Sequence, residues 1–166
     1  MFDTSILDEA IRARRQRLAA EQAELRARAR DISRIGSRIE ERLGTFARSA
    51  EGVDSMGYQI HNLYGAFEQL FEEVARFFEN RVGGIEYRTD LLRRMQLEIQ
   101  GIRPALLAAE TASDLDELRR FRHLFRHAYT ADLDPDKVAS LATKAVRIQR
   151  DFSQDFERFL ALLRPE

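Results

Sequence analysis

The chain has 166 residues, enough for one domain built around a single hydrophobic core. It contains no cysteine, which excludes disulfides and thiolate metal sites, and it has no apolar run of the ~18 residues that a membrane span needs. Its net charge of −1 is unlike that of a dedicated duplex-DNA binder, and its charged N-terminus lacks the apolar core of a signal peptide. We therefore expect a cytoplasmic protein with one domain over 1–166.

Residues 5–48 carry an apolar side chain at every seventh position, a spacing that predicts one long helix. These positions are Ile11, Leu18, Leu25, Ile32, Ile39 and Phe46. A coiled coil also needs a second set of apolar heptad positions, and here that set mixes polar with apolar residues. We therefore expect this arm over 1–50 to need a partner, either the rest of the chain or a second subunit. Gly36 and Gly44 each weaken a helix by roughly 1 kcal/mol, and a break near either one is an alternative.

Apolar side chains at helical spacing continue through most of the remaining sequence. The later helices are predicted at 58–80, 86–100, 112–129 and 135–163. The two glycines within 51–57 predict a connection between the first two helices. Thr111 and Ser113 are candidate N-caps, and Asp134 before Pro135 is typical of a helix start.

The pattern as a whole predicts an all-α protein. No segment alternates convincingly at period two, and β-branched residues are scarce. We predict an up-and-down helical bundle of about five helices, in which a long coiled-coil-like arm over 1–50 precedes a bundle over 58–163.

The candidate chemical groups are concentrated in one predicted helical stretch, residues 119–129. It contains two of the chain's three histidines together with several arginines. At 100° per residue, one broad face collects Arg119, Arg122, His123 and Arg126. The phenylalanines and Leu124 fall on the opposite face, which we expect to enter the core. The cationic face carries side chains that titrate near neutral pH.

Arginine and histidine at short range are a minimal set of groups for metal-free cleavage of RNA, although a helix face with a few arginines is more often simply solvated. An imidazole can take the proton from a 2′-hydroxyl or return one to the leaving oxygen, and a guanidinium can stabilise charge on the phosphate. Arg122 and His127 are five positions apart, about 140° around an ideal helix. Either the helix distorts near its end or two copies of the chain combine to form the site.

The spacing Arg122-x4-His127-x-Tyr129 resembles the motif of HEPN-type ribonucleases, specifically the HepT-like toxins. The flanking stretches 115–121 and 132–135 are also similar to HepT-like chains, and 61–68 is a weaker match. The resemblance implies a helical bundle that forms a homodimer and cleaves RNA, either tRNA or mRNA, without a metal or other cofactor.

The resemblance also implies roles for individual residues. Arg122 would polarise the scissile phosphate, and His127 would be the general acid or base. A separate nucleotidyltransferase antitoxin would attach adenylate to Tyr129 and silence the toxin. From the composition of the cationic face, Arg119, His123 and Arg126 are candidate contacts to RNA.

Other interpretations remain open. The chain can instead be a non-catalytic helical interaction module, an inactive relative that binds RNA or a protein. A metal held by His123 and His127 is a weaker hypothesis because a third ligand is not evident. The arginine-rich arm is either a solvated helix face or a contact for RNA or antitoxin. His61 is most simply a capping or core histidine.

Overall fold

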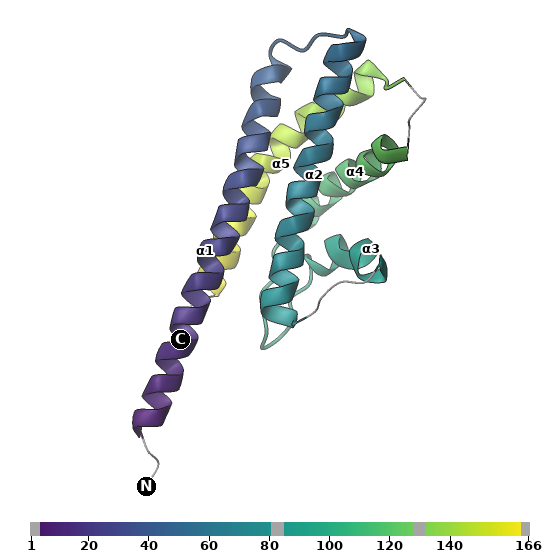
Figure 1. The fold of residues 1–166 in the computed structure, drawn as a ribbon. Coiled ribbons are helices and arrows are strands. Elements are labelled where there is room, and N and C mark those ends of the chain that lie inside the picture. Colours follow the sequence, from purple (N-terminus) through teal and green to yellow (C-terminus); the bar gives the residue numbers. More distant parts are fainter. Residues whose placement is uncertain (1–3, 81–84, 128–131, 164–166) are drawn as a thin grey trace.

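Figure 1 shows the computed structural model, which describes residues 4–80, 85–127 and 132–163. The described residues form five helices: α1 (Thr4–Leu43), α2 (Ala50–Glu79), α3 (Ile85–Arg94), α4 (Ala109–His127) and α5 (Pro135–Leu162). Within these described ranges, β-structure is limited to one isolated bridge between Ile99 and Arg103. The predicted all-α bundle with a long N-terminal helix is confirmed. None of the helices in these ranges has an apolar stretch long enough to cross a membrane.

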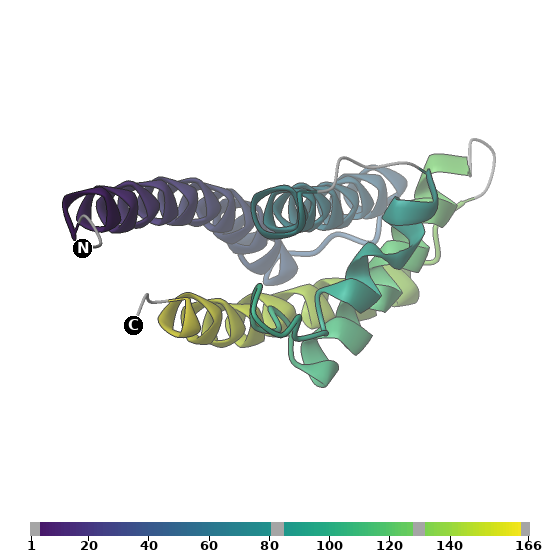
Figure 2. The ribbon, with the colours of Figure 1, turned by 90° about the horizontal axis from the view of Figure 1, so that it is seen from below.

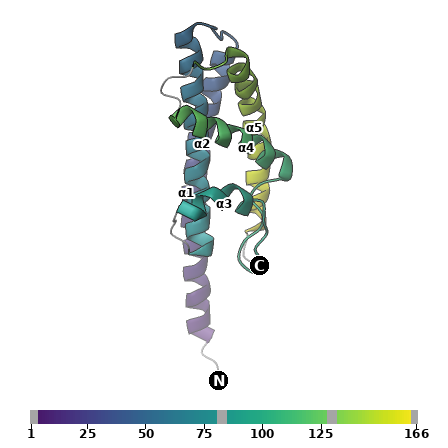
Figure 3. The same ribbon diagram turned by 90° about the vertical axis from the view of Figure 1, so that its right-hand side faces the viewer.

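The helices pack in two layers. α1 and α2 lie side by side and antiparallel in one layer, and α5 in the other layer packs against both of them (Figures 1 and 2). α3 and α4 cross the bundle on one side, where α4 contacts both α2 and α5 (Figure 3). Aromatic side chains from α2 and α5 meet at the centre, with the ring of Phe67 edge-on to that of Phe152 at 4.9 Å. These rings join α2 to α5, and α4 packs against both helices.

α1 is the long helix that the heptad spacing predicts. Leu25, Ile32 and Ile39 are buried in the core, whereas Ile11 is 42% exposed. The N-terminal part of α1 extends beyond the other helices (Figure 1). The helix continues through Gly36 and ends at Leu43, so the break appears only at the second of the two suspected glycines.

α2 begins earlier than predicted, and the expected connection over 51–57 is wrong. Ser49 caps the helix by accepting a hydrogen bond from the amide of Gly52 at 3.2 Å. Gly57 lies within the helix, and a β-carbon there would come within 2.9 Å of the Leu133 side chain, so the packing at this position favours glycine. The glycines that suggested a loop are therefore tolerated inside a helix, and at Gly57 the reason is close packing.

α3 ends at Arg94, six residues before the predicted end at 100. The cause is the buried Arg103, whose guanidinium donates to the carbonyls of Arg94, Leu97 and Pro104. These bonds supply the partners that the free carbonyls at a helix end require. Glu79 completes the cluster through ion pairs with Arg94 and, at 3.6 Å, with Arg103. We call Glu79, Arg94 and Arg103 the buried ion cluster.

α4 starts at Ala109, so the predicted N-caps Thr111 and Ser113 are wrong. Thr111 is buried inside the first turn. The cap comes instead from a distant side chain, because the carboxylate of Asp155 on α5 accepts a hydrogen bond from the Ala108 amide at 2.9 Å. Asp155 is itself only 4% exposed, so it fixes the start of α4 firmly to α5.

The start of α5 agrees with prediction. Asp134 is the N-cap, with its carboxylate accepting from the amide of Asp136 at 2.9 Å, and Pro135 is the first helical residue. Proline suits that position because its missing N–H has no helical partner there.

Candidate functional site

The motif lies in the last turns of α4. Leu115, Leu118 and Phe121 anchor the preceding turns in the core. The helix remains α-helical through His127, without the distortion that would bring Arg122 and His127 onto one face. Tyr129, the predicted modification site, lies outside the described residues.

Arg122 faces α2. Its Nη1 donates to the backbone carbonyl of His61 at 3.1 Å and lies 3.4 Å from His61 Nε2, while its Nε is 4.0 Å from the Glu68 carboxylate. The guanidinium rests on Gly65, where a β-carbon would come within 2.8 Å of Nη1. His61, Gly65 and Glu68 thus form a cradle of i, i+4 and i+7 positions on one side of α2. We call these three residues the Arg122 cradle.

The sequence suggested a capping or core histidine. In the structure, His61 is not a helix cap, and it is only partly enclosed by the core. It lies in the middle of α2, half-buried, with its ring 5.2 Å from the ring of Phe125. Because arginine can only donate, the contact with Arg122 requires a neutral imidazole whose Nε2 accepts and whose proton is on Nδ1. Nδ1 is buried and has no hydrogen-bond partner among the described residues. Burial, followed by the charges of Arg122 and Arg126, lowers the pKa of His61 below its ordinary value of 6.5.

This pKa shift gives a testable pH dependence. Between the ordinary value of 6.5 and the lowered folded pKa, the unfolded chain binds more protons than the folded one, so stability falls as the pH falls. We expect His61→Gln to reduce this slope, as measured by urea denaturation between pH 7.5 and 5. We also expect Arg122→Gln to raise the His61 pKa in an NMR titration without restoring it fully, because burial is the larger cause. An unchanged pKa in Arg122→Gln would contradict the contact between the two side chains.

The remaining candidate residues face solvent. His123 and His127 are exposed one turn apart, with ring centroids 4.6 Å from each other. Arg126 is exposed, and Arg119 is partly held by Asp116 at 2.8 Å. The structure therefore brings the two histidines together at the end of α4, while Arg122 turns away from them toward α2.

The predicted burial of Leu124 on α4 is wrong. This leucine was assigned to the buried face, but it is 46% exposed, whereas Phe121 is buried and Phe125 partly buried. The buried stripe of α4 is narrower than predicted because α4 contacts α2 and α5 from one side only. An apolar side chain is thereby left in solvent between His123 and His127.

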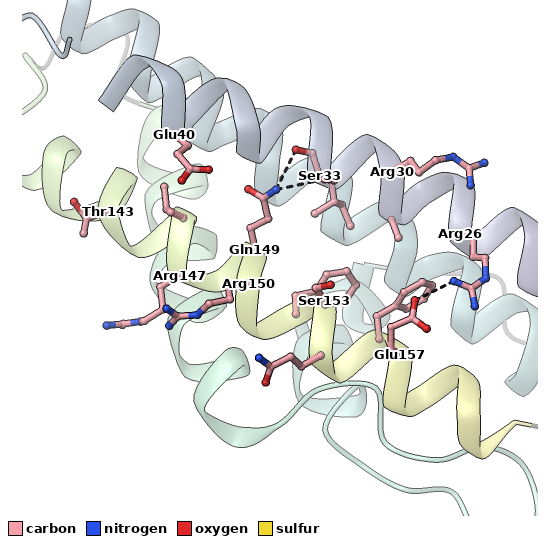
Figure 4. A pocket seen from close by; sticks show the side chains of 16 residues that line it. Arg26, Arg30, Ser33, Glu40, Thr143, Arg147, Gln149, Arg150, Ser153 and Glu157 are labelled. Carbon is pink, nitrogen blue, oxygen red and sulfur yellow. Dashed lines mark hydrogen bonds and ion pairs between the residues drawn. The ribbon is translucent and has the colours of Figure 1, made fainter. Parts of the chain in front are cut away.

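A groove of about 640 Å³ runs between α1 and α2 and reaches Arg122. We call it the α1–α2 groove; residues that line it include Arg34, Arg38, Gln59, Asn62, Glu68 and Arg122. A larger groove of about 910 Å³ lies between α1 and α5 (Figure 4). None of the described motif residues lines that α1–α5 groove, which is bridged by hydrogen bonds from Gln149 to Ser33 and by the ion pair of Arg26 with Glu157. Among the described candidate residues, Arg122 lines the smaller groove, whereas the two histidines and Arg126 lie outside both grooves.

The Arg122 cradle was not predicted from the sequence. Two weak features pointed to it: the similarity of 61–68 to HepT-like chains, and a glycine four residues after a histidine. Across the described ranges, no group of three or more side chains is arranged to hold a metal ion.

Comparison with known proteins adds one finding. A family model described as HepT-like protein matches residues 55–163, well over half of the chain. The matched region begins within α2 and includes α4, so it contains both the Arg122 cradle and the motif residues. A search of curated proteins gave no match.

Proposed function

The chain belongs to the HepT-like family, and we propose that it is a metal-independent endoribonuclease. The observation that carries the proposal is the seating of Arg122 on the Arg122 cradle. Its side chain is 20% exposed and is held by His61 and Glu68 on α2. A guanidinium fixed in this way, with N–H groups left to donate, is ordered before a phosphate arrives, which favours recognition and transition-state stabilisation.

The reaction is an attack of the RNA on its own backbone. His127 takes the proton from a ribose 2′-hydroxyl, and the 2′-oxygen forms a bond to phosphorus. The bond from phosphorus to the 5′-oxygen breaks, and that oxygen takes a proton from water. The products are a 2′,3′-cyclic phosphate and a 5′-hydroxyl, and Arg122 stabilises the charge that builds on the phosphate oxygens.

We propose that two copies of the chain make each site. Arg122 and His127 lie on different sides of an unbroken helix, so one α4 does not present both to one phosphate. The exposed Leu124 supplies an apolar contact for a second α4 in the same place. A two-fold dimer would carry His127 of one subunit to Arg122 of the other and would form two equivalent sites.

The same proposal covers control of the activity. Tyr129 follows His127 by two residues, as in the HepT-like motif. We propose that a nucleotidyltransferase antitoxin attaches adenylate to it, making the protein the toxin of a toxin–antitoxin pair. Phosphate charge added there would occupy the cationic end of α4 and exclude RNA.

The test is RNA cleavage in EDTA. We expect the purified protein to cut tRNA or mRNA and to leave 2′,3′-cyclic phosphate ends, identified by mass spectrometry. A matched oligonucleotide of the same sequence with deoxyribose throughout should remain intact because it lacks the attacking hydroxyl.

The opposite result has a clear meaning. Intact RNA after incubation with a folded protein whose Tyr129 is unmodified by mass spectrometry would remove the enzyme proposal. The protein would then be the non-catalytic interaction module, and binding of RNA or of a protein would be its function.

A further inference from the structure

We propose that the α1–α2 groove is a nucleoside-binding subsite, which takes the base and ribose next to the phosphate held by Arg122. The inference rests on the proposed function and adds a substrate-recognition element to it. Arg122 is part of the groove lining, so a phosphate on its guanidinium has its own ribose at the mouth of the groove. The volume of about 640 Å³ falls within the ~300–1,000 Å³ typical of small-molecule sites.

Three polar side chains in the groove are available to a ligand. The amides of Gln59 and Asn62 and the guanidinium of Arg38 make no hydrogen bond or ion pair with any residue that the structure describes. Gln59 is nevertheless 8% exposed, so most of its surface is already out of water. Polar groups placed in a groove without partners are ready to bond a ligand, and a buried amide gains most from one.

The charge of the lining favours a nucleoside over a second phosphate. Arginines at 34, 38 and 122 are balanced by carboxylates at 31, 68 and 72, so the groove has no net charge. A phosphate gains little from such a surface beyond Arg122 itself. A lining that offers both donors and acceptors suits the edge of a base and the ribose hydroxyls, and amide side chains form paired hydrogen bonds with bases. Guanidinium planes also stack on bases, which single-stranded RNA presents.

The α1–α5 groove lacks these properties. It is larger, but its polar groups are engaged with one another: Arg26 with Glu157, and Gln149 with Ser33 (Figure 4). It is also lined by a different strip of α1 from the one that carries Arg38. Arg30, which lines it, therefore serves as a matched control for Arg38, because both are exposed arginines on the same helix, two turns apart.

The first test measures cleavage kinetics. We expect Arg38→Ala and Asn62→Ala each to raise KM about tenfold with kcat within about twofold, because the contacts bind the substrate and the transition state equally. Asn62→Ala should also flatten the base preference at the cut site. Arg30→Ala should leave KM within about twofold of wild type, since it removes the same charge from α1 but from outside the α1–α2 groove. Equal effects of Arg38→Ala and Arg30→Ala would overturn the subsite.

The second test does not depend on cleavage. The wild-type protein is titrated with the 3′-monophosphates of adenosine, guanosine, cytidine and uridine, and the side-chain amide signals of Gln59 and Asn62 are followed by NMR. We expect at least one nucleotide to shift both signals, and inorganic phosphate to shift neither. No shift with any nucleotide, or equal shifts with inorganic phosphate, would reject the subsite even if RNA is cleaved. Shifts without cleavage would keep the subsite and reject the ribonuclease.

Discussion

Replacing His127 with alanine is expected to slow RNA cleavage by about 10²–10⁴-fold, the usual contribution of a general acid or base. His127 is exposed at the end of α4, so the fold and melting temperature should not change. The measurement is the single-turnover rate at saturating RNA, beside circular dichroism. His123→Ala is the matched control, because its exposed imidazole is one turn away; we expect it to affect KM more than kcat. A His127→Ala rate within a few-fold of wild type would mean that another group moves the proton.

The same variant tests whether the site is shared between subunits. Arg122→Ala and His127→Ala should each be inactive alone, but in a mixed dimer one of the two sites would receive both intact side chains. Random mixing should therefore restore about a quarter of the wild-type activity in a two-fold dimer. If each site were built within one subunit, the mixture would remain as inactive as its components.

The second large effect concerns stability. We expect Glu79→Ala to lower the free energy of unfolding by about 3–5 kcal/mol, the usual cost of removing one member of a buried ion pair. The Arg103 side chain is fully buried, and Glu79 is the carboxylate paired with it in the buried ion cluster. Glu79→Gln keeps a hydrogen-bond acceptor and should lose less. Urea denaturation provides the measurement.

Glu98 provides the control for this comparison. It is an exposed glutamate in the segment that follows α3, and Glu98→Ala should change stability by no more than about 0.5 kcal/mol. A loss below about 1 kcal/mol in Glu79→Ala would place the cluster in the range of solvent-exposed ion pairs and contradict its burial.

Helix type and number could be predicted from sequence because they depend on periodicity. The seam through Leu25, Ile32 and Ile39 identified α1, and its buried positions are the predicted ones. The errors are at helix ends that depend on distant residues. α4 is capped by Asp155, 47 positions away from Ala108, and no local pattern announces such a cap.

In the candidate site, too, the local pattern was predictable and the contacts with distant residues were not. The motif located Arg122 and His127 on one helix, and the 140° between them already indicated an incomplete site. The direction in which Arg122 points could not be predicted, because it depends on α2 lying against α4 with Gly65 at the contact. The exposure of Leu124 was missed for a related reason: helical periodicity gives the apolar residues of a face, but not how much of that face a neighbouring helix covers.

The length of α1 affects how the mass of the particle has to be measured. Its 40 residues span about 60 Å, whereas a compact chain of this size has a radius of gyration of about 15 Å. Such an elongated molecule experiences more friction than a sphere of 19.3 kDa, so a monomer would leave a size-exclusion column early and resemble a dimer. Subunit number should therefore be read from a shape-independent measurement, such as light scattering or sedimentation equilibrium.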